Sequence, residues 1–340
     1  MKKFLIIQTA FIGDVVLATA LVEKLHQHFP DASIDFLLRK GNEVLLKDHP
    51  HIHDVLVWDK KGGKYRDLYR IWKDVRRSKY DHVINVQRFA ATGWITAFSG
   101  AGEAIGFDKN PFSVFFSRSV KHIISTEERP LHETERNQML IEHLTDGRPA
   151  KPRLYPSDTD LKFVAQYKTH PYICFAPASV WFTKQYPKEK WISMLDKIER
   201  SMQVFIIGGP SDKVLGEEIR EACQSKERIV NLCGKLSLLQ SAALQKDAVR
   251  NLVNDSGPMH FASAVNAPVT AIYCSTVPSF GYGPLSDDSA IVQTNVHLSC
   301  KPCGLHGHAA CPEGHFKCAL TIEDEQILAT LRRSTDPLIS

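Results

Sequence analysis

The sequence predicts an α/β protein built from two doubly wound, Rossmann-like domains that face a cleft. The chain has 340 residues, which is too long for one ordinary hydrophobic core and favours two domains of about 150 residues each. Short β-branched runs alternate with longer amphipathic stretches, a pattern typical of parallel strands joined by crossover helices. A proline-rich stretch at 147–157 interrupts the alternation. Because proline removes backbone donors and disfavours helix in the residue before it, we interpret this stretch as the interdomain linker.

The first domain is expected to cover residues 1–150 and the second 158–322, followed by a C-terminal helix and tail at 323–340. In the first domain we predict strands at 4–8, 33–38, 54–58 and 82–86, and helices at 15–29 and 65–79. In the second domain we predict strands at 172–176, 203–209, 228–234, 248–255 and 268–274. Helices are predicted between these strands at 188–200, 212–224, 236–245 and 257–265.

The composition is that of a globular protein in water. Hydrophobic residues make up 43% of the chain and charged residues 24%, and the mean hydropathy is −0.20. The N-terminus resembles a signal peptide, but Gln8, Thr9 and Asp14 break its apolar run and no small-residue cleavage site follows, so we predict a buried strand. No later stretch reaches the roughly 18 apolar residues of a spanning helix. The sequence therefore predicts a cytoplasmic protein that at most touches a membrane surface.

Basic residues gather in one segment, although the net charge is only +4. Between Lys60 and Lys79 there are nine basic residues against two acidic ones, Asp67 and Asp74. Such a segment can attract the phosphates of nucleic acid, anionic lipid or a phosphorylated glycolipid. A solvated helix face is the alternative interpretation.

Ligands of doubly wound sheets bind beyond the carboxyl ends of the strands, so the strand-to-helix loops are the first places to look for chemistry. In the first loop, at 9–21, Gly13 permits a tight or left-handed turn, and Asp14 lies at the start of the helix. The Asp14 carboxylate has two interpretations. It caps its own helix, or it acts on a ligand.

The loops that follow the first two strands of the second domain carry hydroxyl groups, a lysine and two glycines. At 176–191 the loop offers Ser179, Thr183 and Lys184, which suit a phosphate, although an ordinary surface lysine is the alternative. At 206–214 Gly208 and Gly209 would let a ligand approach the backbone. Asp212 then accepts hydrogen bonds either from a ribose or from its own helix.

A fourth loop, at 254–265, combines an acid, a hydroxyl, a glycine and a proline. Asp255 ends a strand, Ser256 and Gly257 form the turn, and Pro258 fits the first helical position. The helix start presents unpaired N–H groups and the positive end of its dipole, which favour an anion such as a diphosphate. Ser256 as a simple helix cap is the alternative.

Two nucleotide-binding signatures are absent. No G-x-x-x-x-G-K-[ST] motif occurs, which argues against a P-loop NTPase. The segment at 100–106 looks like a dinucleotide fingerprint, but its glycine spacing is wrong and we expect it to precede a strand instead of following one. The sequence therefore predicts neither a P-loop nor a dinucleotide-binding motif.

Together, the loops resemble those of the ADP-heptose:lipopolysaccharide heptosyltransferases of glycosyltransferase family 9, whose two domains have the GT-B fold. The resemblance spans nearly the whole chain. It is carried by IGDVVLATAL at 12–21, HETERNQ at 132–138, TKQYP at 183–187, the glycine pair, NDSGPMHFASAVNAPVTAIY at 254–273, and the cysteine-bearing tail. The sequence departs from the family pattern at Ala20, Ala178 and Tyr186, changes that leave the fold intact.

The resemblance implies inverting transfer of heptose from ADP-heptose to the lipopolysaccharide inner core. Asp14 would be the general base, and we expect its carboxylate to stay ionised at the helix start. Lys184 would offset the charge on the departing ADP, with no metal or other cofactor required. The donor-binding residues implied are Gly13, Ser179, Thr183, Gly209, Asp212, Asp255, Ser256, Gly257 and His260.

The family assigns acceptor binding to the N-terminal domain and the nucleotide sugar to the C-terminal domain. The acceptor is a lipid-linked core oligosaccharide, and Arg88, His132 and Arg136 are the candidates for contacts to its anionic groups. Lys40 and the 60–79 segment are candidates for the inner-membrane surface. Two alternatives are a transferase using another nucleotide sugar and a non-catalytic nucleotide-sugar-binding protein. Nucleic-acid binding is not predicted, because the basic helix lacks a stacking platform or recognition motif.

Four of the eight cysteines, Cys300, Cys303, Cys311 and Cys318, cluster in the C-terminal tail. A C-x-x-C start followed by two further cysteines is compatible with a tetrahedral zinc site. Reduced structural thiols are the alternative, since disulfides are rare in the cytoplasm.

Overall fold

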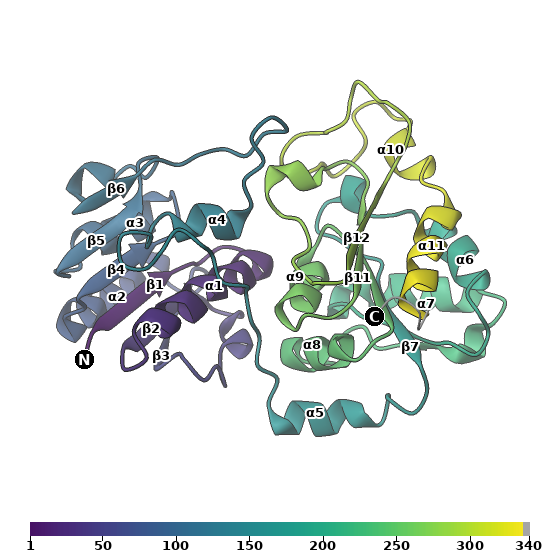
Figure 1. The fold of residues 1–340 in the computed structure, drawn as a ribbon, viewed down its shortest axis with the longest axis horizontal. Helices are drawn as coiled ribbons and strands as arrows, with labels where there is room; N and C mark the ends of the chain where they lie inside the picture. The colour runs from purple at the N-terminus through teal and green to yellow at the C-terminus, as the bar shows by residue number, and fades with distance from the viewer. Residues whose placement is uncertain (336–340) are drawn as a thin grey trace. The chain divides into compact units, whose positions relative to one another are not determined.

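The computed structural model describes residues 1–335 (Figure 1). The chain divides into two compact units, Met1–Tyr155 and the part from Pro156 onward. This boundary falls inside the proline-rich stretch at 147–157. The stretch up to Tyr155 packs on the first unit: the Arg153 N–H donates to Thr19 Oγ1 at 2.9 Å, and the Tyr155 hydroxyl donates to Glu23 at 3.0 Å.

The first unit contains a six-stranded parallel sheet in the order β3-β2-β1-β4-β5-β6. Its strands are β1 Lys3–Ile7, β2 Ser33–Arg39, β3 Asp54–Trp58, β4 His82–Asn85, β5 Glu103–Phe107 and β6 Arg118–Val120. Its helices are α1 Ile12–His28, α2 Lys64–Ser78, α3 Ala90–Ala97 and α4 Glu133–Gln138, with the 3-10 turns η1 Glu43–Leu45 and η2 Ser113–Phe115.

The second unit repeats this design with a parallel sheet in the order β12-β11-β10-β7-β8-β9. Its strands are β7 Tyr172–Ala176, β8 Gln203–Ile206, β9 Ile229–Asn231, β10 Arg250–Asn254, β11 Val269–Tyr273 and β12 Ser289–Gln293. Its helices are α5 Asp158–Ala165, α6 Lys188–Asp196, α7 Lys213–Ala222, α8 Leu238–Lys246, α9 Gly257–Ala264, α10 Lys317–Leu320 and α11 Asp324–Thr335. Its 3-10 turns are η3 Phe182–Lys184, η4 Pro210–Asp212, η5 Lys226–Arg228 and η6 Pro278–Phe280.

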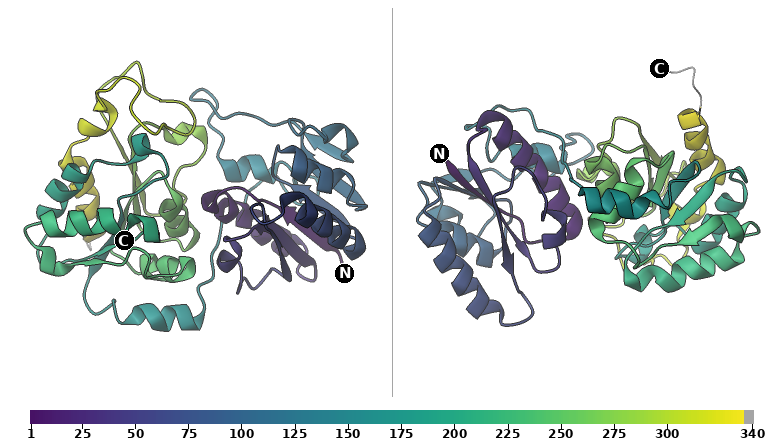
Figure 2. Two further views of the ribbon diagram at one scale, coloured as in Figure 1. Left: turned by 180° about the vertical axis from the view of Figure 1, so that it is seen from behind. Right: turned by 90° about the horizontal axis from the view of Figure 1, so that it is seen from below.

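Both sheets have the doubly wound order, in which successive strands are added first on one side of the first strand and then on its other side. The order reverses between β1 and β4 in the first unit and between β7 and β10 in the second. Helices lie on both faces of each sheet, as the two further views show (Figure 2). The loops after these four strands therefore meet at the two switch points, where such sheets bind ligands.

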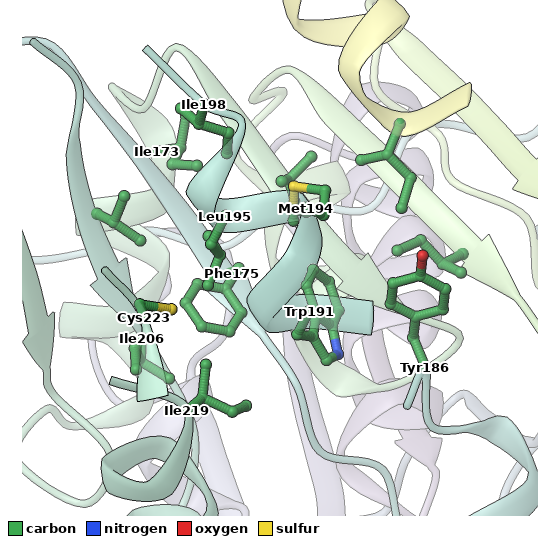
Figure 3. Packing of buried hydrophobic residues seen from close by; sticks show 14 of the residues in the cluster. Ile173, Phe175, Tyr186, Trp191, Met194, Leu195, Ile198, Ile206, Ile219 and Cys223 are labelled. Carbon is green, nitrogen blue, oxygen red and sulfur yellow. The ribbon is translucent and has the colours of Figure 1, made fainter. Parts of the chain in front are cut away.

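The central strands read as continuous apolar runs because both of their faces are buried. All five residues of β7, β10 and β11 are buried, even the Arg250 and Asn254 side chains. On one face of the second sheet, Trp191 of α6 lies between Phe175 and Tyr186 (Figure 3). The Trp191 ring is 5.1 Å from that of Phe175 and 5.2 Å from that of Tyr186. This packing fixes the end of the loop that carries Lys184.

All nine predicted strands and all seven predicted helices are present, but several of their ends differ. The strand predicted at 203–209 ends at Ile206, and the one predicted at 228–234 shortens to Ile229–Asn231. The prediction missed β5, β6 and β12, two of which lie at sheet edges. Glu103–Gly106 belong to β5, so the glycine segment at 100–106 runs into a strand instead of preceding it. The predicted C-terminal helix is α11, and 336–340 lie outside the described residues.

None of the helices within residues 1–335 has the length and apolar character needed to cross a bilayer.

Candidate functional site

Lys184 and Asp255 form an ion pair at the switch point of the second sheet. Lys184 ends η3 in the loop after β7, and Asp255 follows β10. The Lys184 ammonium lies 2.6 Å from the Asp255 carboxylate, with only 16% and 9% of the two side chains exposed. Thr276, after β11, donates a second hydrogen bond to Asp255 at 2.7 Å. Three strand-to-helix loops thus meet at one carboxylate.

Asn254, which the sequence analysis did not single out, holds the lysine loop at both ends. Its amide nitrogen donates to the Pro177 carbonyl at 2.8 Å, and its amide oxygen accepts from the Tyr186 N–H at 3.0 Å. The side chain is fully buried. Its signal in the sequence is a polar residue at the buried carboxyl end of a central strand, directly before Asp255.

The N-terminus of α9 has no side-chain cap. Ser256 occupies the cap position with extended backbone, but its hydroxyl donates to the Asn254 carbonyl at 3.3 Å, so the capping alternative is wrong. The helix begins at Gly257, which puts Pro258 at the second helical position and not at the predicted first. His260 is buried in the first turn. The helix start therefore retains the N–H groups and dipole that suit an anion.

Thr183 is a positioning residue in this structure. Its buried hydroxyl accepts a hydrogen bond from the His308 N–H at 2.8 Å and another from Ser275 at 3.0 Å. Its backbone N–H donates to the His308 carbonyl at 3.1 Å. Thr183 thereby ties the 307–308 segment to the lysine loop. Ser179, also predicted for the donor, lies in the same loop with its carbonyl accepting from Gln185 at 2.7 Å.

The glycine pair after β8 makes room for protein atoms. A Cβ on Gly208 would lie 2.7 Å from the Asp212 carboxylate and 3.1 Å from the Cys233 sulfur. The Asp212 carboxylate accepts from the Gly209 N–H at 2.8 Å. The structure thus agrees with the second interpretation of Asp212, in which its carboxylate caps the turn that begins the following helix.

In the first unit, Asp14 lies in the first turn of α1, after β1. The helix begins at Ile12, so Asp14 is its third residue, and its carboxylate accepts from the Phe11 N–H at 3.1 Å. Gly13 is inside the helix and has no left-handed backbone, contrary to prediction. Burial, followed by the charge of Glu133, raises the pKa of Asp14 from 3.8 to about 6. The carboxylate is therefore more readily protonated than we expected from its place at a helix start.

The three predicted acceptor residues have different surroundings. Arg136 of α4 is buried and lies 3.0 Å from Glu133 and 3.5 Å from His122. Arg88, after β4, is exposed. Burial, with the charges of Arg88 and Arg136, lowers the pKa of His122 to about 4, so both cations act on this imidazole. His132 caps α4, its ring nitrogen accepting from the Thr134 N–H at 3.2 Å.

Two further cations, Lys60 and Arg39, lie beside the β1–α1 loop. The Lys60 ammonium donates to the Thr9 carbonyl at 2.8 Å and lies 4.7 Å from the Trp58 ring centre. Burial, together with the charges of Arg39 and Lys64, lowers the pKa of Lys60 to about 8. Arg39 ends β2 and packs over Phe11 at 5.0 Å. Applying the carboxyl-end rule to β2 and β3 as well would have identified both residues. Lys40, in contrast, is an exposed residue paired with Asp59 at 2.8 Å.

The four tail cysteines are free thiols that line one small cavity. They are Cys300, Cys303, Cys311 and Cys318, and the Cys300 sulfur is 4.0 Å from His315 Nε2. Within the described part of the chain, no group of three or more His, Cys, Asp or Glu side chains is arranged to hold a metal ion. The structure therefore does not support the zinc interpretation.

Residues 68–312 match the model of a protein family described as Glycosyltransferase family 9 (heptosyltransferase). The chain is 28% identical over 289 residues to lipopolysaccharide heptosyltransferase 3 of Escherichia coli (strain K12), covering 78% of this chain and 80% of that protein.

Two solved structures share the fold over nearly the whole chain. One is the glycosyl transferase family 9 protein of Veillonella parvula DSM 2008, with a TM-score of 0.84, 22% identity, and coverage of 98% of this chain and 97% of that one. The other is the E. coli heptosyltransferase WaaC with ADP, with a TM-score of 0.74, 15% identity, and coverage of 98% and 100%. These likenesses and the two parallel sheets confirm the predicted GT-B fold.

Proposed function

The chain belongs to glycosyltransferase family 9, and from this membership we propose that it is an inverting heptosyltransferase that transfers heptose from ADP-heptose to the lipopolysaccharide inner core. The observation that carries the proposal is the Lys184–Asp255 pair beside the uncapped start of α9. Together they offer the Lys184 cation and a helix dipole to one anion. ADP, which accompanies WaaC in its solved structure, is an anion of this kind.

On the donor side, the diphosphate binds at the start of α9 and competes with Asp255 for the Lys184 ammonium. As the bond between the anomeric carbon and the phosphate oxygen breaks, negative charge grows on the departing ADP. A lysine and helix N–H groups held in place before the reaction stabilise that charge. Asn254 and Thr183 contribute by holding the lysine loop.

On the acceptor side, Asp14 takes the proton from the attacking hydroxyl group. The acceptor oxygen forms its bond to the anomeric carbon while the bond to ADP breaks on the opposite face, which inverts the configuration in one displacement. A pKa of about 6 suits this role, because the carboxylate is mostly ionised at neutral pH yet more basic than an ordinary aspartate. Glu133 supports Asp14 by raising that pKa.

Lys60 and Arg39 bind an anionic group of the acceptor beside Asp14, and Arg88 is the third candidate. The Lys60 ammonium contacts a carbonyl and an aromatic ring, and the charged groups that lower its pKa are the cations Arg39 and Lys64. A half-buried ammonium in such surroundings gains from a phosphate or carboxylate ligand. The lipid of the acceptor would keep the reaction at the cytoplasmic face of the inner membrane.

A donor screen tests this function. ADP-heptose and other ADP-, UDP- and GDP-sugars are offered with heptose-deficient lipopolysaccharide, and the released nucleoside diphosphate and the anomeric configuration of the product are measured. Release of ADP only with ADP-heptose, with an inverted product, is the expected result. Turnover of a different nucleotide sugar alone would overturn the donor assignment. Nucleotide-sugar binding without any transfer would favour the non-catalytic alternative.

A further inference from the structure

One side of the first unit carries a row of aromatic side chains edged by cations, and we propose that this row is a docking surface for an anionic lipid bilayer. We call it the aromatic face. It comprises Tyr65, Tyr69, Trp72, Lys73 and Arg76 of α2, Trp94 and Phe98 at α3, and Phe112, Val114 and Phe115 at η2. Its position in the first unit can be followed from α2 and α3 in Figure 1.

The sequence of α2 places these groups on one flank of the helix. Leu68, Ile71 and Val75 form the buried stripe that packs on the sheet. Tyr65, Tyr69, Trp72 and Arg76 recur at intervals of three or four residues and share the adjacent flank. This flank is well exposed, with Tyr65 76% and Tyr69 50% accessible to solvent.

Ring contacts join α2 to α3 and η2 without interruption. Successive ring centres are 5.4 Å apart from Tyr69 to Trp72, 5.3 Å from Trp72 to Trp94, and 6.4 Å from Trp94 to Phe98. Phe98 continues to Phe115 at 5.9 Å. The Trp72 indole N–H also donates to the Phe98 carbonyl at 2.8 Å. The row is therefore a fixed surface and not a set of independent side chains.

Cations border the row, and the acids of α2 lie elsewhere. Lys73 lies 4.7 Å from the Tyr69 ring centre, and Arg76 lies 5.7 Å from that of Trp72. Arg77 is also exposed. The two acidic residues of the helix, Asp67 and Asp74, occupy the far flank, where both pair with Arg70. The aromatic face is thus positively charged, which complements an anionic surface.

A bilayer fits this face better than nucleic acid does. The exposed rings of Tyr65 and Tyr69 bear on the expectation that the basic helix lacks a stacking platform or a recognition motif. However, the most exposed apolar side chain of the aromatic face is Val114 at 82%, next to Phe115 at 59%. Valine cannot stack on a base, and Trp72 and Trp94 are already packed together. Aliphatic and phenyl groups that insert, with tryptophan, tyrosine and cations around them, are the pattern of a membrane interface.

The test measures binding of the full-length protein to vesicles by flotation. Mixed phosphatidylglycerol and phosphatidylcholine vesicles are compared with pure phosphatidylcholine. We expect binding to the anionic vesicles only, reversed by high salt. The variant Lys73→Gln/Arg77→Gln should weaken that binding about 30-fold, at about fivefold per charge. The variant Val114→Ser/Phe115→Ser should weaken it about tenfold through lost apolar burial.

A matched control, Lys162→Gln/Lys246→Gln, removes the same charge from exposed positions in the second unit and should bind like the unmodified protein. Equal binding to neutral vesicles, or undiminished binding of both surface variants, would refute the proposal. Two other results would also refute it, each with vesicle binding unchanged in the surface variants. If those variants lose a dimer that the unmodified protein forms, the face binds a second copy of the chain. If they instead lose binding to single-stranded DNA, the face binds nucleic acid. The vesicles contain no acceptor, so the outcome does not depend on the proposed transfer reaction.

Discussion

At the switch point of the first sheet, the half-buried Asp14 carboxylate lies within the electrostatic influence of a second carboxylate, Glu133. At the matching point of the second sheet, the Asp255 carboxylate is paired with Lys184 at 2.6 Å. The two sheets have the same strand order, so the fold does not set this difference. The first unit keeps a carboxylate basic, as a proton acceptor requires. The second keeps a cation close to a helix start, as an anionic leaving group requires.

Removing the basic carboxylate of the first unit should have the greatest effect on activity. Asp14→Asn should lower the transfer rate about 10²- to 10⁴-fold, the usual contribution of a general base. ADP binding, measured by calorimetry, should persist, because the residues proposed to bind the nucleotide lie in the second unit. Asp31→Asn, at an exposed position, is the control. Unchanged turnover in Asp14→Asn would remove Asp14 from the mechanism.

The same variant also has a stability signature. The folded pKa of Asp14 lies above its unfolded value of 3.8, so the folded state holds the proton more tightly and stability is lost as the pH rises from about 4 to about 6. Asp14→Asn should therefore be more stable than the parent protein at pH 7, by about 1–3 kcal/mol. Denaturant unfolding at pH 4 and pH 7 checks this, and the gain should vanish at pH 4.

Removing the cation of the Lys184–Asp255 pair should have the second-largest effect on the transfer rate. Lys184→Met should slow transfer about 10²- to 10³-fold by removing charge stabilisation from the leaving group. It should also destabilise the protein by about 3 kcal/mol, because it leaves Asp255 buried without its cation. Adding Asp255→Asn should restore much of the stability and none of the activity. A double variant that recovers transfer would mean that the ion pair is only structural.

The pH dependence separates the two switch points further. Below about pH 6, kcat/KM should fall about tenfold per pH unit, because Asp14 becomes protonated and cannot accept a proton. Glu133→Gln removes one cause of the raised pKa, so the inflection should move to lower pH, while burial keeps it above 3.8. Glu127→Gln, at an exposed position nearby in the sequence, should leave the profile unchanged. An inflection that stays in place would exclude Glu133 as a cause.

Substitutions in the 307–308 segment, which Thr183 ties to the lysine loop, should have the smallest effect on ADP binding. Gly307 has a φ of +77°, and a Cβ there would lie 2.9 Å from the Thr183 hydroxyl, whereas Gly314, with a φ of +70°, has no atom within 4 Å of its Cβ position. Both alanine variants should lose about 1 kcal/mol to backbone strain. Only Gly307→Ala should also weaken ADP binding, by about threefold to tenfold. Equal affinities would show that this segment does not position the lysine loop.

Local sequence patterns suffice to define the two α/β units, because apolar runs and their alternation with amphipathic stretches are properties of neighbouring residues. They also place Asp14, Lys184 and Asp255 in the loops after strands. The edge strands β6 and β12 escaped prediction because they are short and largely exposed: β6 has three residues, and only Val292 of β12 is buried. The interaction of Asp14 with Glu133, the pairing of Lys184 with Asp255 and the clamp at Asn254 join residues more than 65 positions apart. Only the folded chain brings them together, since their energies depend on burial and distance, which a linear pattern does not specify.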